Sequence, residues 1–493
     1  MFRRVLVANR GEVAVRILRT CRDLGLSSVA VYEPLEREAL TVRLADWCVE
    51  LTGTLGYRDA EQLVAIAKER GCDALHPGYG YFAENSRFVR RCEDAGIRFV
   101  GPDAATLATV SDKVGAMRAA AAAGFETPEH SARSYEEGQQ EEAAVDAACL
   151  GYPLLVKSTR GGRGRGMRLV RKPEQFAEAF RAAQEQTELN YGNRRVFLER
   201  YFRRVHVLGV QVLADDAGEI AVLGEREGSV QRGNQKLVDE TPSPWLGPER
   251  RRDLQEKAVR LTRLFGCCGA STVEFLGMPD GRFLFTEIKP RLQREHLVTE
   301  MVTGIDLVSW QLRLAAGERL DATLPEAAAR RGHAIQCRIN AQDPWHDFLP
   351  SPGRVQWMRL PGGPHVRTDT HLVPGAEVPA AYDPGLATVA VRGETREIAV
   401  RRLTRALVEM TFVGVPNDVP LHVRFVRDPR FLAGDYDASF FSPELLKGNG
   451  DQGHRRDLAV LAALAYVRHH LDFKPELPEE ALTGWFRESR RVP

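Results

Sequence analysis

Residues 274–300 read EFLGMPDGRFLFTEIKPRLQREHLVTE, and this stretch decides the fold of the middle of the chain. Side chains of a strand alternate between its two faces, so the odd positions from Glu287 to Glu295 are expected to share one face, and all of them are polar or charged. Pro279-Asp280-Gly281 supplies a turn that folds the runs on either side into an antiparallel hairpin. The pattern predicts that Glu274 and Glu287 lie together on neighbouring strands.

Two carboxylates on neighbouring strands suit a magnesium ion. Mg²⁺ prefers oxygen ligands and usually shares its coordination shell with substrate phosphates. We therefore predict Glu274 and Glu287 as metal ligands. The alternative is a surface hairpin with solvated salt bridges, but five successive polar positions on one face, next to a buried-type run, favour a site.

Composition excludes several classes of function. The 493 residues contain 68 Lys and Arg against 67 Asp and Glu, and a net charge of +1 gives no support for nucleic acid or an anionic membrane as the main partner. No segment approaches the length of a membrane span, so we expect a cytoplasmic protein. The eight cysteines are scattered without a CxxC pair, which predicts reduced thiols.

The order of expected elements indicates an α/β region followed by α+β regions. Strand-like runs at 3–8, 27–32 and 97–102, with helical patterns between them, predict a parallel sheet with covering helices in roughly the first 110 residues. From about residue 152 strands alternate with helices at 173–187 and 248–265, and a third region begins near Arg331. The tail from 443 contains a polar linker and a helix expected at 456–470.

Three polar loops are candidates for ligand contacts. The glycine run Arg160–Gly166, directly after Lys157, can bring backbone N–H groups and guanidinium groups against phosphates, although it matches neither a P-loop nor a dinucleotide fingerprint. A mobile basic hairpin tip is the alternative for this run. The loop from Gln231 to Lys236 can orient an anion, and the turn at 76–80, followed by Glu84, is expected at the carboxyl edge of the first sheet.

Many of these segments together resemble one known family. LVANRGEVAVRIL, LHPGYGYFAEN, SDKVGAM, GYPLLVKS, SVQRGNQKLVDETPSP, TEIKPRLQREHLVTEMVTGIDL and GHAIQCRINAQDP look like biotin carboxylase, the ATP-grasp component of biotin-dependent carboxylases. They follow the family's order from residue 3 to about 440. The resemblance implies a Rossmann-like domain at 1–112, an ATP-grasp domain at 113–330 with a mobile lid at about 130–205, an α+β biotin carboxylase C-terminal domain at 331–445, and a helical tail at 446–493.

The resemblance also implies a role for each site residue. ATP contacts are implied for Lys113, Lys157 and Glu199, and for the flap glycines Gly162, Gly164 and Gly166 over the phosphates; Gln231 and Asn234 lie on the nucleotide side of the polar loop. Glu274 and Glu287 match the magnesium ligands. Bicarbonate ligands are implied at Lys236, Arg291 and Gln293, a general base at Glu295, and an arginine that stabilises the biotin enolate at Arg338; Arg294 falls in the bicarbonate and biotin pocket.

By the same resemblance, the reaction is ATP- and bicarbonate-dependent carboxylation of biotin through carboxyphosphate, with Mg²⁺ or Mn²⁺ as the metal. None of the seven methionines is followed by lysine, so the Met-Lys attachment site of carrier domains is absent. We therefore expect biotin to be free or on a separate carrier protein. The resemblance further implies a homodimer that works with a carboxyltransferase subunit in a system like acyl-CoA carboxylase.

Several site positions depart from the family pattern. Lys289 stands where the family usually has an asparagine that helps to hold metal, and Arg294 stands where it has a small apolar residue. Thr388 replaces a lysine, and Gly209 replaces a glutamate. These changes leave two alternatives open: an ATP-grasp ligase with an acceptor other than biotin, and a catalytically impaired paralogue that regulates a carboxylase.

Overall fold

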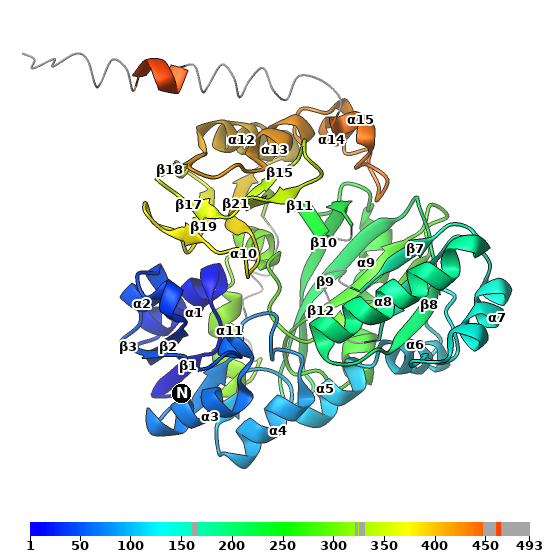
Figure 1. The fold of residues 1–493 in the computed structure, drawn as a ribbon, viewed down its shortest axis with the longest axis horizontal. Coiled ribbons are helices and arrows are strands. Elements are labelled where there is room, and N and C mark those ends of the chain that lie inside the picture. Colours follow the sequence, from blue (N-terminus) through cyan, green and yellow to red (C-terminus); the bar gives the residue numbers. More distant parts are fainter. Residues whose placement is uncertain (160–165, 234, 321–323, 325–330, 447–459, 465–493) are drawn as a thin grey trace, which may run out of the picture. The chain divides into compact units, whose positions relative to one another are not determined.

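The first sheet has five parallel strands in the order β3-β2-β1-β4-β5, as predicted. The strands are β1 (Arg4–Val7), β2 (Ser27–Tyr32), β3 (Trp47–Glu50), β4 (Ala74–His76) and β5 (Arg98–Phe99), and the helices that connect or follow them are α1 (Gly11–Asp23), α2 (Leu40–Leu44), α3 (Ala60–Glu69), α4 (Ser86–Asp94) and α5 (Ala104–Val110) (Figure 1). The chain leaves β1 and β4 in opposite directions along the sheet, which makes their carboxyl ends a switch point where ligands gather. There the Asn9 amide donates to the carbonyls of Pro77 and Tyr79.

A separate small sheet forms within the segment expected to be a lid. Its three antiparallel strands, in the order β7-β6-β8, are β6 (Leu154–Ser158), β7 (Arg168–Val170) and β8 (Val196–Arg200), and the neighbouring helices are α6 (Lys113–Ala122), α7 (Gln140–Leu150) and α8 (Phe176–Tyr191). Tyr135, Phe176 and Phe180 belong to a hydrophobic cluster that lies within this segment alone. The segment therefore has a core of its own.

The largest sheet has eight antiparallel strands in the order β13-β12-β9-β10-β11-β14-β21-β19. They are β9 (His206–Ala214), β10 (Ile220–Arg232), β11 (Gln235–Thr241), β12 (Gly269–Gly277), β13 (Phe283–Lys289), β14 (His333–Asn340), β19 (Val366–Asp369) and β21 (Gly385–Gly393). The predicted hairpin is confirmed: β12 pairs with β13, and Gly281, at φ +94°, donates to Met278 in the turn between them. Strands from beyond residue 331 extend this central sheet, so the third region does not form its main sheet alone.

The remaining elements lie around the large sheet or follow it. The helices are α9 (Pro248–Leu264), α10 (His296–Thr303), α11 (Leu307–Ala315), α12 (Arg396–Glu409), α13 (Val419–Phe425), α14 (Pro429–Ala433) and α15 (Pro443–Leu446). The short strands form the pairs β15 (Gln342–Asp343) with β16 (Leu349–Pro350), β17 (Gly353–Arg354) with β20 (Glu377–Val378), and β18 (Trp357–Arg359) with β22 (Thr411–Val413).

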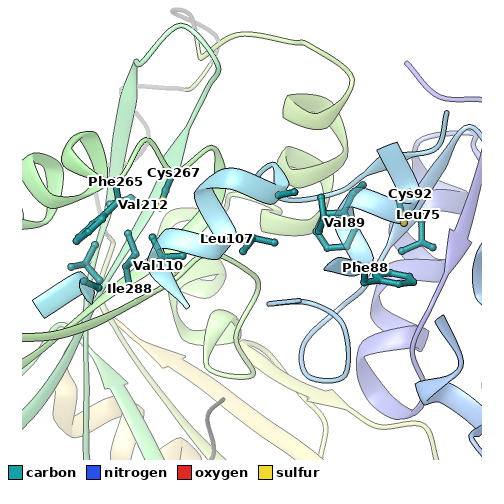
Figure 2. Close-up of a cluster of buried hydrophobic side chains, with 14 of the residues drawn as sticks. Leu75, Phe88, Val89, Cys92, Leu107, Val110, Val212, Phe265, Cys267 and Ile288 are labelled. Carbon is teal, nitrogen blue, oxygen red and sulfur yellow. The ribbon is translucent and has the colours of Figure 1, made fainter. Parts of the chain in front are cut away.

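One hydrophobic cluster joins the first sheet to the central sheet (Figure 2). On the side of the first sheet, the cluster contains Leu75 of β4 and Phe88 of α4. It continues through α5 and reaches the central sheet, with the residues Leu107, Val110, Val212, Phe265 and Ile288. Because these residues are almost fully buried, the cluster removes a continuous apolar surface from water, which is the main stabilising contribution to a fold. The first sheet and the central sheet therefore share one hydrophobic core.

This computed structural model describes residues 1–159, 166–233, 235–320, 324, 331–446 and 460–464. Met1–Leu445 form one compact unit, and Leu446–Pro493 form a second unit. In the second unit residues 460–464 are helical, in agreement with the expected helix at 456–470, whose other residues lie outside the described part. No helix among the described residues is long and apolar enough to cross a membrane.

Candidate active site

The β12–β13 hairpin brings two carboxylates together. Glu274 pairs with Glu287 across the strands, and the register shifts between Glu274 and Phe275. The two side chains are only 12% and 21% exposed. The structure therefore places the two acids side by side in a largely buried position, as the sequence predicts.

Three lysine ammonium groups surround this acid pair. Lys236 Nζ lies 3.1 Å from Glu274 Oε1, and Lys113 Nζ lies 3.2 Å from Glu287 Oε2. Lys289 Nζ lies between the acids, 3.0 Å from Glu287 Oε1 and 3.8 Å from Glu274 Oε2. Burial lowers the pKa of Lys289, but the two carboxylates outweigh burial and hold the pKa above its ordinary value. Lys289 therefore contributes a full positive charge at neutral pH.

β13 ends at Lys289, so the predicted strand through Glu295 is wrong. Pro290 has no N–H to donate to a strand ladder, and the chain turns after it toward α10. Gln293 and Glu295 still reach the acid pair from this turn. Gln293 Nε2 donates to Glu274 Oε1 at 2.9 Å, and Glu295 Oε1 lies 3.5 Å from Lys236 Nζ.

Arg291 points from the same turn to the loop between β4 and α4. Its Nε donates to Glu84 Oε1 at 2.8 Å, and the arginine side chain is 12% exposed. From the sequence, Glu84 is expected near a ligand-binding edge, and no partner is predicted for it. The structure shows that Glu84 orients a guanidinium beside the hairpin.

The buried charges set the protonation of the carboxylates. Burial raises the pKa of Glu295, but Lys236 and Arg226 outweigh burial and hold the pKa below its ordinary range. Burial, and then the nearby charge of Glu295, raise the pKa of Asp239. Glu295 is therefore ionised at neutral pH, and Asp239 takes up a proton more readily than Glu295 does.

Arg226 is a site residue that the sequence analysis missed. It lies in β10 with 2% exposure, and its guanidinium donates to Gln211 Oε1, Thr272 Oγ1, Gln293 Oε1 and Thr299 Oγ1 at 2.7–3.1 Å. By holding the Gln293 oxygen, it turns the Gln293 amide nitrogen toward Glu274. The signal for it was the run Glu225-Arg226-Glu227 inside a strand, because consecutive charges in a buried strand require partners.

The side of the site predicted to bind nucleotide contains a second buried ion pair. Lys157 Nζ lies 2.9 Å from both carboxylate oxygens of Glu199. Burial raises the pKa of Glu287, but Lys113, Lys289 and Lys157 outweigh burial and hold this pKa well below its ordinary value. The flap joins β6 to β7, and of its predicted glycines Gly166 is described, at φ +81°. Gly162, Gly164 and Asn234 lie outside the described residues. Gln231 pairs with Lys236 across β10 and β11.

Arg338, in β14, and Arg294, in the turn before α10, converge on one carboxylate. Arg338 Nη2 donates to both oxygens of Asp383 at 2.6 and 2.7 Å, and Arg294 Nη1 lies 3.7 Å from the same group. Arg294 Nε also lies 2.5 Å from Glu12 Oε1 and 3.1 Å from the Tyr79 hydroxyl. The Arg294 guanidinium is therefore held by acids from the first sheet region and from the C-terminal region.

The arrangement does not fit a metal ion held by protein side chains alone. Among the described residues, no group of three or more His, Cys, Asp and Glu side chains converges as a metal site. The Lys289 ammonium occupies the space between Glu274 and Glu287, and an ammonium has no lone pair to donate to a metal. The site is instead a row of alternating charges that can bind and activate a small anion.

Comparisons with known proteins identify the family to which each part of the chain is similar. Three family models cover most of the chain: biotin carboxylase, N-terminal domain, at residues 1–107; carbamoyl-phosphate synthase L chain, ATP binding domain, at 112–323; and biotin carboxylase C-terminal domain, at 336–443. Together, the fold and the site define an ATP-grasp ligase.

The similarity to individual proteins shows to which family of ATP-grasp ligases the chain belongs. The chain is 42% identical to biotin carboxylase of Nostoc sp. strain PCC 7120 over 442 residues, which are 89% of this chain and 98% of the relative. It is 39% identical to biotin carboxylase 1 of Bacillus subtilis strain 168, over 89% of this chain and 98% of that protein. The chain belongs to the biotin carboxylase family.

Solved structures give the same result. The biotin carboxylase domain dimer of Hydrogenobacter thermophilus 2-oxoglutarate carboxylase, in complex with MgADP, ADP and bicarbonate, matches with a TM-score of 0.87 and 37% identity, over 91% of this chain and 99% of that one. Biotin carboxylase from Campylobacter jejuni matches with a TM-score of 0.84 and 33% identity, over 89% and 98% of the two chains. The expected Rossmann-like, ATP-grasp and C-terminal architecture is confirmed.

Proposed function

We propose that this protein carboxylates biotin in a reaction that consumes ATP and bicarbonate and passes through carboxyphosphate. The observation that carries the proposal is the grouping of Lys236, Glu295 and Gln293 around the acid pair, beside Arg291. This grouping supplies an ionised base, two cationic groups and an amide within a largely buried space. The relatives named as biotin carboxylases and the neighbour solved with MgADP and bicarbonate support the choice of substrates.

In the first half-reaction, Glu295 removes the proton of bicarbonate. Lys236, Arg291 and Gln293 hold the anion, and its freed oxygen attacks the γ-phosphorus of ATP, so that the bond from that phosphorus to ADP breaks and carboxyphosphate forms. Lys236, 3.5 Å from Glu295, keeps this base ionised in the resting state, and proximity to the held anion compensates for its low basicity.

Nucleotide binding is assigned to Lys113, Lys157 and Glu199, with the flap around Gly166. Magnesium brought with the nucleotide would neutralise phosphate charge at these residues, and the MgADP complex of the Hydrogenobacter neighbour supports this choice of metal. In this proposal the buried lysines add positive charge where negative charge develops on the transferred phosphoryl group.

In the second half-reaction, carboxyphosphate releases CO2 as its carbon–oxygen bond to phosphate breaks. The phosphate takes the N1 proton of biotin, and the resulting enolate captures CO2 through N1. Arg338, oriented by Asp383, stabilises the enolate oxygen. Arg294, which shares Asp383, lines the same pocket.

We also propose the setting in which this reaction occurs. The 493 residues contain no Met-Lys pair to carry biotin, and we propose that a biotin carrier and a carboxyltransferase act with the chain in a system like acyl-CoA carboxylase. The dimer of the Hydrogenobacter neighbour supports a homodimer. We place the protein in the cytoplasm, and we propose the domain limits 1–112, 113–330 and 331–445.

The test is ADP release measured with purified protein, MgATP and bicarbonate, with and without free biotin. We expect release that requires bicarbonate and rises with biotin. No stimulation by biotin, with stimulation by another amine or carboxylate, would instead support a different acceptor. No turnover under any condition would support the regulatory paralogue.

A further inference from the structure

The position of Lys289 is the feature of the site that the proposed reaction does not use. Lys289 is the last residue of β13, opposite Thr272, and its side chain is 12% exposed. Its ammonium touches Glu287 at 3.0 Å and approaches Glu274 to 3.8 Å. It therefore lies where two facing carboxylates would otherwise share a cation.

The carboxylate oxygens around Lys289 are already matched by donors from the chain. Glu274 Oε1 accepts from Lys236 and Gln293, and Glu274 Oε2 faces Lys289. Of the two oxygens of Glu287, one faces Lys289 and the other faces Lys113. Each oxygen of the acid pair thus has a positively charged neighbour within 4 Å, before any metal ion is added.

Lys289 also belongs to a larger group of paired ammonium and carboxylate charges. The ammonium groups of Lys113, Lys236 and Lys289 face the carboxylates of Glu274, Glu287 and Glu295, and all contacts are 3.0–3.8 Å. An uncharged side chain at position 289 would remove the ammonium between Glu274 and Glu287, so each of these two buried carboxylates would lose one positively charged neighbour. The Lys289 ammonium would repel a divalent ion placed between the two acids. Moving this ammonium out into water would break its contact with Glu287.

We propose that the Lys289 ammonium is a built-in cation that replaces a protein-held divalent metal ion between Glu274 and Glu287, so that the protein takes up magnesium only as its complex with the nucleotide. This inference rests on the proposed function, because it concerns the phosphate-facing side of that site. An ammonium can also donate hydrogen bonds to phosphate oxygens, which a metal ion would otherwise bind.

The experiment measures Mn²⁺ binding by electron paramagnetic resonance, without bicarbonate or biotin. For the nucleotide-free wild-type protein we expect Mn²⁺ binding at least about tenfold weaker than for Lys289→Asn, in which the amide opens the acid pair to metal. Lys289→Arg is the matched control, because it keeps the charge and is expected to bind Mn²⁺ as weakly as the wild type. Adding Glu287→Gln to Lys289→Asn should abolish the gained binding.

A second measurement uses the wild-type protein saturated with ADP, where we expect one Mn²⁺ per chain, against two for Lys289→Asn. Wild-type affinity within twofold of Lys289→Asn, or two Mn²⁺ per wild-type chain with ADP, would overturn the inference. Circular dichroism melting of each variant shows whether it is folded, and the wild-type stoichiometry decides the matter without any variant. Because no acceptor is present, either result leaves the test of biotin carboxylation independent.

Discussion

The buried carboxylate of Glu240 is expected to be a major source of stability for the part of the fold that carries the active site. Glu240 is fully buried in β11, the strand that also bears Lys236. Its oxygens accept from Arg396 at 2.8 and 2.9 Å, and from His333 and Tyr436. These contacts join β11 to β14, to α12 and to the segment after α14.

The size of this contribution follows from the pKa of Glu240. Burial raises this pKa, but the hydrogen bonds from His333 and Arg396 outweigh burial, and the pKa falls from 4.5 to about 2. At about 1.4 kcal/mol for each pH unit, this difference corresponds to about 3 kcal/mol of folding free energy. The loss of one partner from a buried ion pair costs about 3–5 kcal/mol, which is the same range.

The perturbation is Glu240→Gln, which removes the charge and keeps the shape. We expect the free energy of unfolding in urea, followed by tryptophan fluorescence at pH 7, to fall by about 3 kcal/mol. A carboxyl group whose pKa is lower in the folded protein than in the unfolded chain stabilises the fold at pH values above its unfolded pKa. This stabilisation is lost as the pH falls toward the pKa of the folded protein. At pH 3.5 the wild type has therefore lost about 1.4 kcal/mol of the stabilisation by Glu240. The difference in the free energy of unfolding between the wild type and Glu240→Gln narrows accordingly.

Glu256→Gln is the matched control, since Glu256 is exposed on α9 and the same substitution there should change stability by less than about 0.5 kcal/mol. The reasoning fails if Glu240→Gln costs less than about 1 kcal/mol at pH 7, or if its gap to the wild type is as wide at pH 3.5.

Four further outcomes are expected. Glu295→Gln should lower kcat for bicarbonate-dependent ADP release about 10²–10⁴-fold while calorimetry shows an unchanged affinity for MgADP, because only the proton acceptor is lost; an equal loss of nucleotide affinity would contradict its role. Lys157→Met should weaken ADP binding in the same calorimeter by about tenfold or more, because a charge-assisted contact is lost, and unaltered binding would remove Lys157 from the nucleotide site. Arg226→Met should raise the KM for bicarbonate more than the KM for ATP, because Gln293 loses the donor that orients it, with Arg226→Lys intermediate; equal effects on both constants would point to general misfolding. Chelation of magnesium should stop ADP release and its restoration should recover it, and turnover that persists in chelator would refute a nucleotide-bound metal.

Short sequence patterns predicted which side chains lie together near the β12–β13 hairpin. Contacts between residues that are distant in the sequence could not be predicted from such patterns. Pro279-Asp280-Gly281 predicted the hairpin, and with it the approach of Glu274 to Glu287. The same period-two pattern failed after Pro290, because polar side chains in a turn can mimic one face of a strand. The pattern predicted that these side chains lie close together, which is confirmed, but it predicted the wrong backbone structure after Pro290.

Partners that are distant in the sequence were beyond such patterns. Glu84 is 207 residues from Arg291, and no local spacing relates them. Arg226 could not be predicted for a different reason. Burial of an arginine costs free energy unless its guanidinium is hydrogen-bonded, so an arginine in a sequence is expected to be exposed. The four acceptors that make burial of Arg226 possible are known only from the structure. The extension of the central sheet by β14 also required knowledge of its pairing with β11.

The ion pairs of Arg291 with Glu84 and of Arg294 with Glu12 have a consequence for how such enzymes evolve. Both arginines lie in the segment that matches the ATP-binding model, and both acids lie in the segment that matches the N-terminal model. A gene rearrangement that moved the ATP-binding segment alone would leave two largely buried guanidinium groups without counterions, at a cost of several kcal/mol. The two segments are thus expected to be inherited as one piece, and a successful chimaera should take both members of each of these ion pairs from the same parent.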